Sequence, residues 1–150
     1  MSNLDYKRGE VAILKQQLRD PQVEKDPKAK RAVLEKVIGY MTTGIDMAPL
    51  FAEMILATAR ETIVLKKIGY LYIGRYAETQ PELALLAVNT LRKDTMDSDP
   101  MIRGLALRTL SSLRVANLTE YLKDPISKCL VDASPYATAS FLQCIIVTFK

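Results

Sequence analysis

Apolar residues in this chain recur at the spacing of an α-helix rather than that of a strand. Val33, Leu34 and Val37, for example, lie three or four residues apart, so that a helix would place them on one side. No segment alternates apolar and polar residues as a half-buried strand would. The pattern predicts an all-α protein without a sheet.

A short motif marks the start of four of the predicted helices. Each copy begins with a residue whose side-chain oxygen can accept a hydrogen bond from the first turn, and proline follows in three copies. The four copies are Asp26-Pro27, Thr62-Ile63, Asp99-Pro100 and Ser134-Pro135. From 26 to 62, 62 to 99 and 99 to 134 the spacings are 36, 37 and 35 residues, a period typical of stacked helical hairpins.

The apolar positions that follow the four caps align in columns. The columns are Val33, Gly69, Ala106 and Phe141; Leu34, Tyr70, Leu107 and Leu142; and Val37, Ile73, Leu110 and Ile145. Such a helix face is stable only when a neighbouring element covers it. The alignment therefore predicts that each hairpin packs against the next.

Four further helices are expected between these. Their approximate ranges are 4–19, 47–58, 81–94 and 118–131, and Pro125 is expected to kink or split the last of them. The full prediction is eight antiparallel helices in four HEAT- or armadillo-like hairpins. They would form one right-handed α-solenoid segment over residues 1–150 with an atypical last helix.

Length and composition fit one ordinary domain. The chain has 150 residues, of which 49% are hydrophobic and 25% charged, so a real core is expected. Neither an apolar run of about 18 residues nor the apolar segment of a secretion signal is present, which favours a cytosolic chain.

Catalysis is disfavoured by the residue types. The sequence contains no histidine, which removes the usual general base and the common zinc ligand, and its six glycines form no phosphate loop. Cys129 and Cys144 match no metal spacing and are expected to be buried thiols in a reducing compartment. We expect no catalytic, metal or cofactor site, although catalysis by Asp, Glu or Lys stays formally possible.

Charge argues against nucleic acid as a partner. The net charge of +4 divides into +2 for residues 1–50 (9 basic, 7 acidic), −1 for 51–100 (6 and 7) and +3 for 101–150 (6 and 3). No third has the one-sided charge typical of a nucleic-acid binder.

Several segments resemble the start of a beta-adaptin, the beta-type large chain of the heterotetrameric adaptor-protein coats. They are "KRGEVAILKQQL", "YMTTGIDMAPLF", "LKKIGYLYIGRYA", "QPELALLAVNTLRKD", "DPMIRGLALRTLSSLRV" and "LTEYLKDPISKCL". "GIDMAPLF" and "PMIRGLALRTLSSLRV" look most like the beta chain of adaptor complex four. The resemblance covers residues of about 7–136 in order.

This resemblance implies a non-enzymatic scaffold for vesicle-mediated protein transport. Its partners would be a mu-type medium chain, a second large chain, a small chain and an Arf-type GTPase. The complex would associate peripherally with the cytosolic face of trans-Golgi network or endosomal membranes.

The resemblance weakens after Tyr136. Family members continue with "YVR", whereas this chain reads Tyr136-Ala137-Thr138 and then "ASFLQCIIVTFK". A fragment, a truncated isoform or a diverged short paralogue would each explain this ending. The last helix is apolar on more than one side, which predicts self-association.

A basic residue follows three of the caps: Lys30, Lys66 and Arg103. We expect each to bond to the neighbouring inter-helix turn or its acidic cap, and a ligand-binding row is the alternative.

Lys25, Lys28, Lys30 and Arg31 form a second cluster, in "KDPKAKR". They are candidates for contact with anionic lipid headgroups, which the resemblance also implies. A solvated helix start is the alternative.

Leu85 and Val88 lie three residues apart in the apolar segment "PELALLAVNTL", where they could share an outer face. The resemblance implies that this pair binds Arf, and a wholly buried helix is the alternative.

The tyrosines of "GYLYIGRY" are expected to serve packing. Tyr70 and Tyr76 fall in the core columns and Tyr72 falls outside them; a surface that stacks on peptides is the alternative.

Other function classes remain open from the sequence. One is a lipid-binding module at the membrane surface, acting through the cluster around Lys28. Another is a truncated competitor of a full-length beta-adaptin, and a remote third is a lyase or regulatory enzyme on a HEAT-like scaffold.

Overall fold

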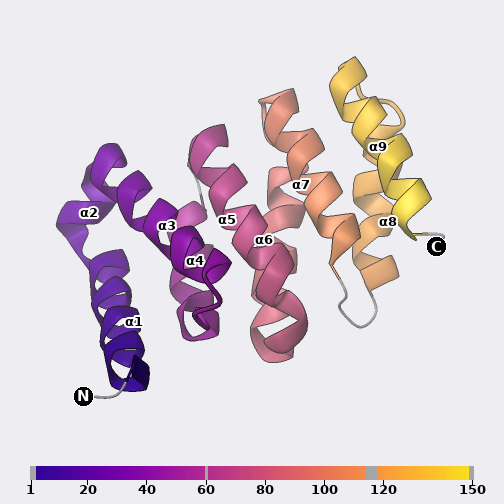
Figure 1. Ribbon diagram of the computed structural model, residues 1–150. Helices are drawn as coiled ribbons and strands as arrows, with labels where there is room; N and C mark the ends of the chain where they lie inside the picture. The colour runs from indigo at the N-terminus through magenta and orange to yellow at the C-terminus, as the bar shows by residue number, and fades with distance from the viewer. Residues whose placement is uncertain (1–2, 60, 114–117, 149–150) are drawn as a thin grey trace. The chain divides into compact units, whose positions relative to one another are not determined.

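The computed structural model of the chain describes residues 3–59, 61–113 and 118–148 (Figure 1). Over these ranges the regular structure consists of nine α-helices and two short 3₁₀ turns, and no strand occurs in them. The predicted all-α class is confirmed.

The helices follow one another as hairpins. The first contains α1 (Asn3–Arg19), the short α2 (Pro21–Lys25) and α3 (Pro27–Thr42), and the second contains η1 (Ala48–Leu50), α4 (Phe51–Thr58) and α5 (Ile63–Tyr76). The third contains η2 (Ala77–Thr79), α6 (Pro81–Asp94) and α7 (Pro100–Ser112), and the fourth contains α8 (Leu118–Cys129) and α9 (Pro135–Thr148). All eight expected helices are present.

Two of the four predicted caps, Asp26 and Asp99, form the expected side-chain hydrogen bonds. The Asp26 carboxylate accepts a hydrogen bond from the N–H of Lys28 at 2.9 Å, and Asp99 accepts one from Met101 at 2.8 Å. The additional helix α2 has the same cause, because Asp20 accepts from the N–H of Gln22 at 2.8 Å and Pro21 follows the cap.

Of the two outcomes expected at Pro125, a kink or a split, the split is wrong. Helix α8 runs through this proline as one element, and Pro125 is buried. A proline inside a helix removes one backbone hydrogen bond. Burial of the apolar ring offsets part of that cost, so tertiary packing overrides the local signal.

The chain divides within α5 into two compact units, Met1–Tyr72 and Ile73–Lys150. In the first unit α1 packs against both α3 and α4, and Arg19 of α1 hydrogen bonds to Glu53 of α4, a residue only 6% exposed.

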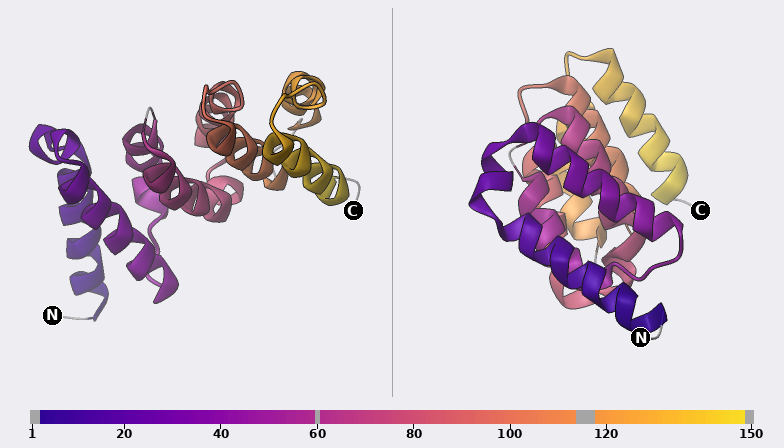
Figure 2. Two further views of the ribbon diagram at one scale, coloured as in Figure 1. Left: turned by 90° about the horizontal axis from the view of Figure 1, so that it is seen from above. Right: turned by 60° about the vertical axis from the view of Figure 1, so that its left-hand side comes forward.

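In the second unit α7 packs against α6, α8 and α9, while α6 also packs against α8 (Figure 2). Within each unit, corresponding helices of successive hairpins therefore lie side by side: α1 with α4, α6 with α8, and α7 with α9. Within each unit, this arrangement confirms that one hairpin covers the next.

The aligned columns form the core where their side chains are described. The buried members are Val33, Leu34, Val37, Gly69, Tyr70, Ile73, Ala106, Leu107 and Leu110. Leu142, on the last helix, is instead 59% exposed. The side chains of Phe141 and Ile145, and of the two cysteines, lie outside the described part of the structure.

Tyr72 is fully buried although it falls outside the predicted core columns, so the packing role expected of it is confirmed. Its hydroxyl donates to the carbonyl oxygen of Met47 at 2.5 Å, and its ring lies 6.1 Å from that of Phe51. Tyr70 and Tyr76 are buried as predicted. Helix α5 is therefore covered on a wider arc than the columns alone indicate.

Gly69 allows α5 to approach α4 closely. A Cβ atom added to Gly69 would lie 1.9 Å from Cγ2 of Thr58. The buried Thr58 cannot easily turn away, because its hydroxyl donates to the carbonyl oxygen of Met54 at 2.9 Å.

We therefore expect Gly69→Ala to lower the free energy of unfolding by about 1–3 kcal/mol through overpacking. Urea denaturation followed by circular dichroism would measure the change. The matched control is Gly74→Ala in the same helix, where nothing lies within 4 Å of the added Cβ. That variant should be stabilised by roughly 0.5–1 kcal/mol, and equal effects at the two sites would contradict the close approach.

Candidate interaction surfaces

Lys30 is the first of the three basic residues that follow a helix cap, and it connects one hairpin to the turn of the next. The Lys30 Nζ atom lies 2.6 Å from Glu61 Oε1 and 2.8 Å from Glu24 Oε2, and the Lys30 side chain is only 2% exposed. Glu61 belongs to the turn between α4 and α5. Lys30 therefore has the structural role that we expected.

Arg103 repeats this arrangement in the second unit. Its Nε and Nη2 atoms donate to the two carboxylate oxygens of Asp132, both at 2.8 Å, and Asp132 lies in the turn between α8 and α9. Its Nη1 atom donates to the carbonyl oxygens of Asp97 and Ser98 at 2.9 and 3.0 Å. One guanidinium thus joins the turn between α6 and α7 to the turn between α8 and α9.

Lys66, the remaining member, is 1% exposed, and its ammonium lies 5.9 Å from the centroid of the Tyr70 ring. None of the three residues presents its charge to solvent as a ligand-binding row would require.

The bond between Arg103 and Asp132 has an electrostatic consequence. The hydrogen bonds from Arg103, and then the one from the backbone N–H of Ser134, hold the pKa of Asp132 below its ordinary value. Because the folded pKa is lowered, this carboxylate stabilises the fold above its unfolded pKa of about 3.9, and the contribution is lost as the pH falls below that value.

Asp132→Asn should therefore destabilise the chain by roughly 1–2 kcal/mol at pH 7, because two charge-assisted hydrogen bonds are weakened. The difference from the unsubstituted chain should shrink in urea titrations near pH 3. Asp124→Asn is the control, since Asp124 is 66% exposed and pairs with Arg92 at 3.4 Å. A loss of more than about 0.5 kcal/mol in the control would contradict this assignment.

The proposed headgroup cluster is smaller than expected. Lys25, Lys28 and Arg31 are exposed, but Lys30 is buried in its two ion pairs, so its inclusion is wrong. The sequence hides this distinction because all four residues lie within seven consecutive positions, 25–31. We refer to Lys25, Lys28 and Arg31 as the α2–α3 basic patch.

Leu85 and Val88 do not share an outer face. Leu85 is 46% exposed, whereas Val88 is fully buried. The buried residues of α6 include Ala84, Val88 and Leu91, which follow the i, i+4, i+7 pattern of one core stripe.

The exposed neighbour of Leu85 is Leu86, which is 41% exposed. We refer to Leu85 and Leu86 as the α6 outer face. Because this helix is apolar on two sides, its sequence leaves the choice between Leu86 and Val88 open.

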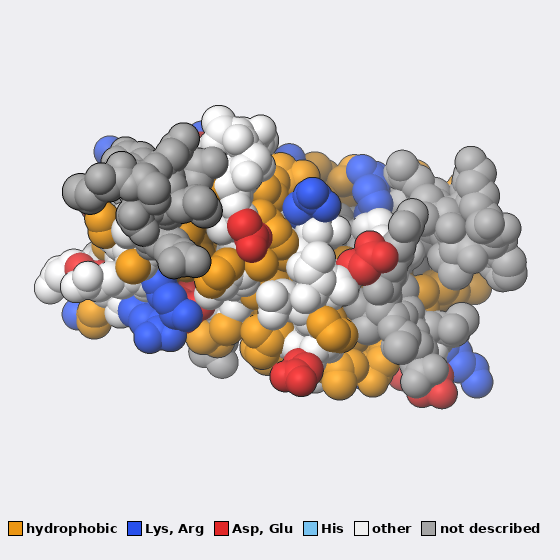
Figure 3. Space-filling view, turned by 60° about the horizontal axis from the view of Figure 1, so that its bottom comes forward, with side chains coloured by type: hydrophobic (Ala, Val, Ile, Leu, Met, Phe, Trp, Pro, Cys, Tyr) orange, Lys and Arg blue, Asp and Glu red, His pale blue; other side chains and the backbone are white. Residues whose placement is uncertain are grey.

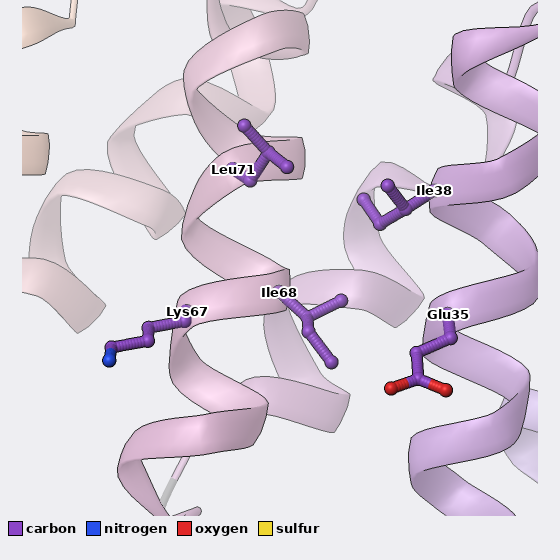
Figure 4. A pocket seen from close by; sticks show the side chains of 5 residues that line it. All are labelled: Glu35, Ile38, Lys67, Ile68 and Leu71. Atoms are coloured by element: carbon purple, nitrogen blue, oxygen red, sulfur yellow. The ribbon is translucent and has the colours of Figure 1, made fainter.

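A further apolar surface, which the sequence analysis missed, lies between α3 and α5. A pocket of about 280 Å³ is lined there by Glu35 and Ile38 of α3 and by Lys67, Ile68 and Leu71 of α5 (Figure 4). The sequence signal that could have revealed this surface is the spacing of Val64, Ile68 and Leu71. These residues lie at i, i+4 and i+7, beside the core columns.

Charges on the surface are mixed. On the face that Figure 3 shows, basic and acidic side chains are interspersed among hydrophobic ones rather than gathered in a single block. Among the described residues there is no group of three or more His, Cys, Asp or Glu side chains that could hold a metal ion. Within the same ranges, no helix has both the length and the apolar character needed to cross a bilayer.

Fold and contacts together define a helical-hairpin repeat protein, in which buried basic residues tie one hairpin to the turn of the next. Residues 10–150 match the adaptin N-terminal region, and the chain therefore belongs to the adaptin family.

Its relatives are beta-type chains, as the motifs predicted. The chain is 50% identical over 132 residues to beta-adaptin-like protein A of Arabidopsis thaliana, with 86% of this chain and 16% of the relative covered. It is 47% identical over 126 residues to the AP-4 complex subunit beta-1 of Mus musculus (84% and 17% covered) and 41% identical over 139 residues to the AP-1 complex subunit beta-1 of Homo sapiens (93% and 14%). The chain thus spans about a sixth of the length of these relatives.

Proposed function

We propose that this chain acts as a non-enzymatic scaffold in a vesicle coat adaptor complex for intracellular protein transport from the trans-Golgi network. The observation that carries the proposal is the match to the adaptin N-terminal region over residues 10–150. Stacked hairpins bind through extended helical surfaces, so the mechanism is association with partners without a bond being made or broken.

The proposed partners are the other subunits of the complex and an Arf-type GTPase. The names of the mouse and human relatives describe them as complex subunits, which supports a mu-type medium chain, a second large chain and a small chain as partners. For the GTPase we propose the α6 outer face, because Leu85 and Leu86 present apolar side chains to solvent whereas Val88 is buried.

Capture experiments test this assignment. The tagged chain should recover a mu-type subunit from cytosol, and Arf only in its GTP-bound form. Leu85→Asp together with Leu86→Asp should lower Arf recovery about tenfold or more, since a charge replaces two apolar contacts. Circular dichroism should stay unchanged because both residues are exposed.

Leu56→Asp is the control, because Leu56 is 66% exposed and lies on α4. Recovery of neither partner would refute the scaffold role. Arf capture that survives the double substitution would show that the GTPase binds elsewhere.

A second candidate function is binding to anionic lipid headgroups through the α2–α3 basic patch. Each basic residue near a charged membrane contributes about 1 kcal/mol, so Lys25, Lys28 and Arg31 together are sufficient for weak peripheral binding. The Glu35 carboxylate reduces this attraction, since it accepts a hydrogen bond from Arg31 at 2.7 Å.

Vesicle flotation tests the patch with phosphatidylcholine vesicles containing phosphatidylserine. Changing Lys25, Lys28 and Arg31 to Glu should abolish flotation, and added salt should weaken that of the unsubstituted chain. Changing the exposed residues Lys93, Arg108 and Lys123 to Glu alters the net charge equally and should have a smaller effect. Equal losses in the two triple variants would indicate attraction by overall charge.

A short chain could also compete with a full-length beta-adaptin. In that alternative the chain captures Arf or a subunit but prevents complex assembly, and adding it to a reconstituted complex would displace the longer chain.

A further inference from the structure

Helix α5 carries a second apolar stripe outside the core. Val64 is 43% exposed, Leu71 is 59% exposed and Ile68 is half-buried between them. At 1.5 Å per residue, the seven residues from Val64 to Leu71 span about 10 Å, or two helical turns. Apolar side chains on this scale, contiguous and exposed, are typical of a binding surface rather than of a solvated helix.

The stripe forms one wall of the pocket between α3 and α5. Figure 4 shows Ile68 of α5 and Ile38 of α3 extending toward each other across the gap, with Leu71 further along α5. All five lining residues belong to the first compact unit, so the pocket does not depend on how the two units are arranged.

The size of the pocket limits its occupant. Its volume of about 280 Å³ is below the roughly 300–1,000 Å³ of most small-molecule sites. It suits one or two aliphatic side chains supplied by a larger partner. A groove between two helices, lined on one side by an i, i+4, i+7 stripe, is the geometry in which amphipathic helices bind.

Charge at the rim determines which helix fits. Glu35 is already paired with Arg31 at 2.7 Å. The exposed Lys67 is among the residues that line the pocket and makes no hydrogen bond or ion pair with any residue in the described ranges. Figure 4 shows its side chain extending from α5 on the side away from α3. With Glu35 paired, Lys67 is the charged residue of the lining that keeps its charge available, which favours a carboxylate on the partner.

We propose that the α3–α5 groove, lined by Ile38, Ile68 and Leu71, binds an amphipathic helix of a partner protein. This helix presents two aliphatic side chains one turn apart, with an acidic residue on the flank that crosses α5, where it pairs with Lys67. The inference goes beyond the scaffold role, since it uses neither the α6 outer face nor the α2–α3 basic patch.

The test uses a synthetic helical peptide with a fluorescent label, leucines at positions i and i+4, and glutamate beside them. Fluorescence anisotropy measures its binding to the full chain. Replacing the glutamate of the peptide with lysine should weaken binding about threefold, because an exposed ion pair is lost. Amide NMR shifts on adding the peptide should map to α3 and α5.

Two variants and one control separate the groove from other surfaces. Leu71→Glu should weaken binding about tenfold, because a leucine side chain loses its apolar contact, and Lys67→Glu should weaken it about threefold. Leu56→Glu, an equally exposed change on α4, should leave binding unchanged. Both groove residues are exposed, so folding should be preserved and circular dichroism would confirm it.

Three outcomes would overturn the proposal. The first is that the glutamate peptide and the lysine peptide bind equally well to the unsubstituted chain, and that neither groove substitution changes their binding. The second is flotation with neutral phosphatidylcholine vesicles that Leu71→Glu abolishes, which would assign the stripe to a membrane. The third is self-association in sedimentation that Leu71→Glu abolishes, which would assign it to a second copy of the chain. Capture of Arf through Leu85 and Leu86 is independent of all three.

Discussion

Each hairpin in this chain has an apolar face that its own two helices cannot cover, and the rest of the structure depends on that constraint. In the second unit α7 contacts α6 within its hairpin and both α8 and α9 of the next, so its core column of Ala106, Leu107 and Leu110 is closed by a neighbour. Stability in such a repeat therefore comes from the interfaces between hairpins as much as from the hairpins themselves. Polar groups at the turns follow the same rule, since Lys30 and Arg103 each pair with a carboxylate of the next inter-helix turn.

The covering of one face decides what remains for binding. Buried basic residues stabilise the stack and are withdrawn from solvent, whereas the outer faces keep their exposed apolar residues on α5 and α6. Under the proposed scaffold role, these outer faces are the surfaces available to partner proteins. Two of these surfaces, the α6 outer face and the α3–α5 groove, present apolar side chains, whereas the α2–α3 basic patch presents charge. Because the three surfaces share no residue, substitutions in one of them test one proposed partner at a time.

The sequence-based errors concern side chains that the fold buries. Val88 was placed on an outer face, Lys30 was included in the headgroup cluster and Tyr72 fell outside the predicted core columns, and each is fully or almost fully buried. Val88 and Lys30 lie on the core stripes of their own helices, whereas Tyr72 lies on α5, which is covered more widely than the columns indicate. The proline inside α8 is similar, because burial of its ring outweighs the local signal for a break.

The sequence by itself determined the all-α class, the start of the second long helix of each hairpin and the family, because capping hydrogen bonds and helical periodicity act between residues close together in the chain. Its repeat also predicted that Lys30 and Arg103 bond to neighbouring turns. Only the tertiary structure decided which apolar side chains face solvent, since burial of Val88 and exposure of Leu71 depend on contacts between helices far apart in the sequence. The groove between α3 and α5 exists for the same reason: its two walls come from different hairpins, and no local pattern records the distance between them.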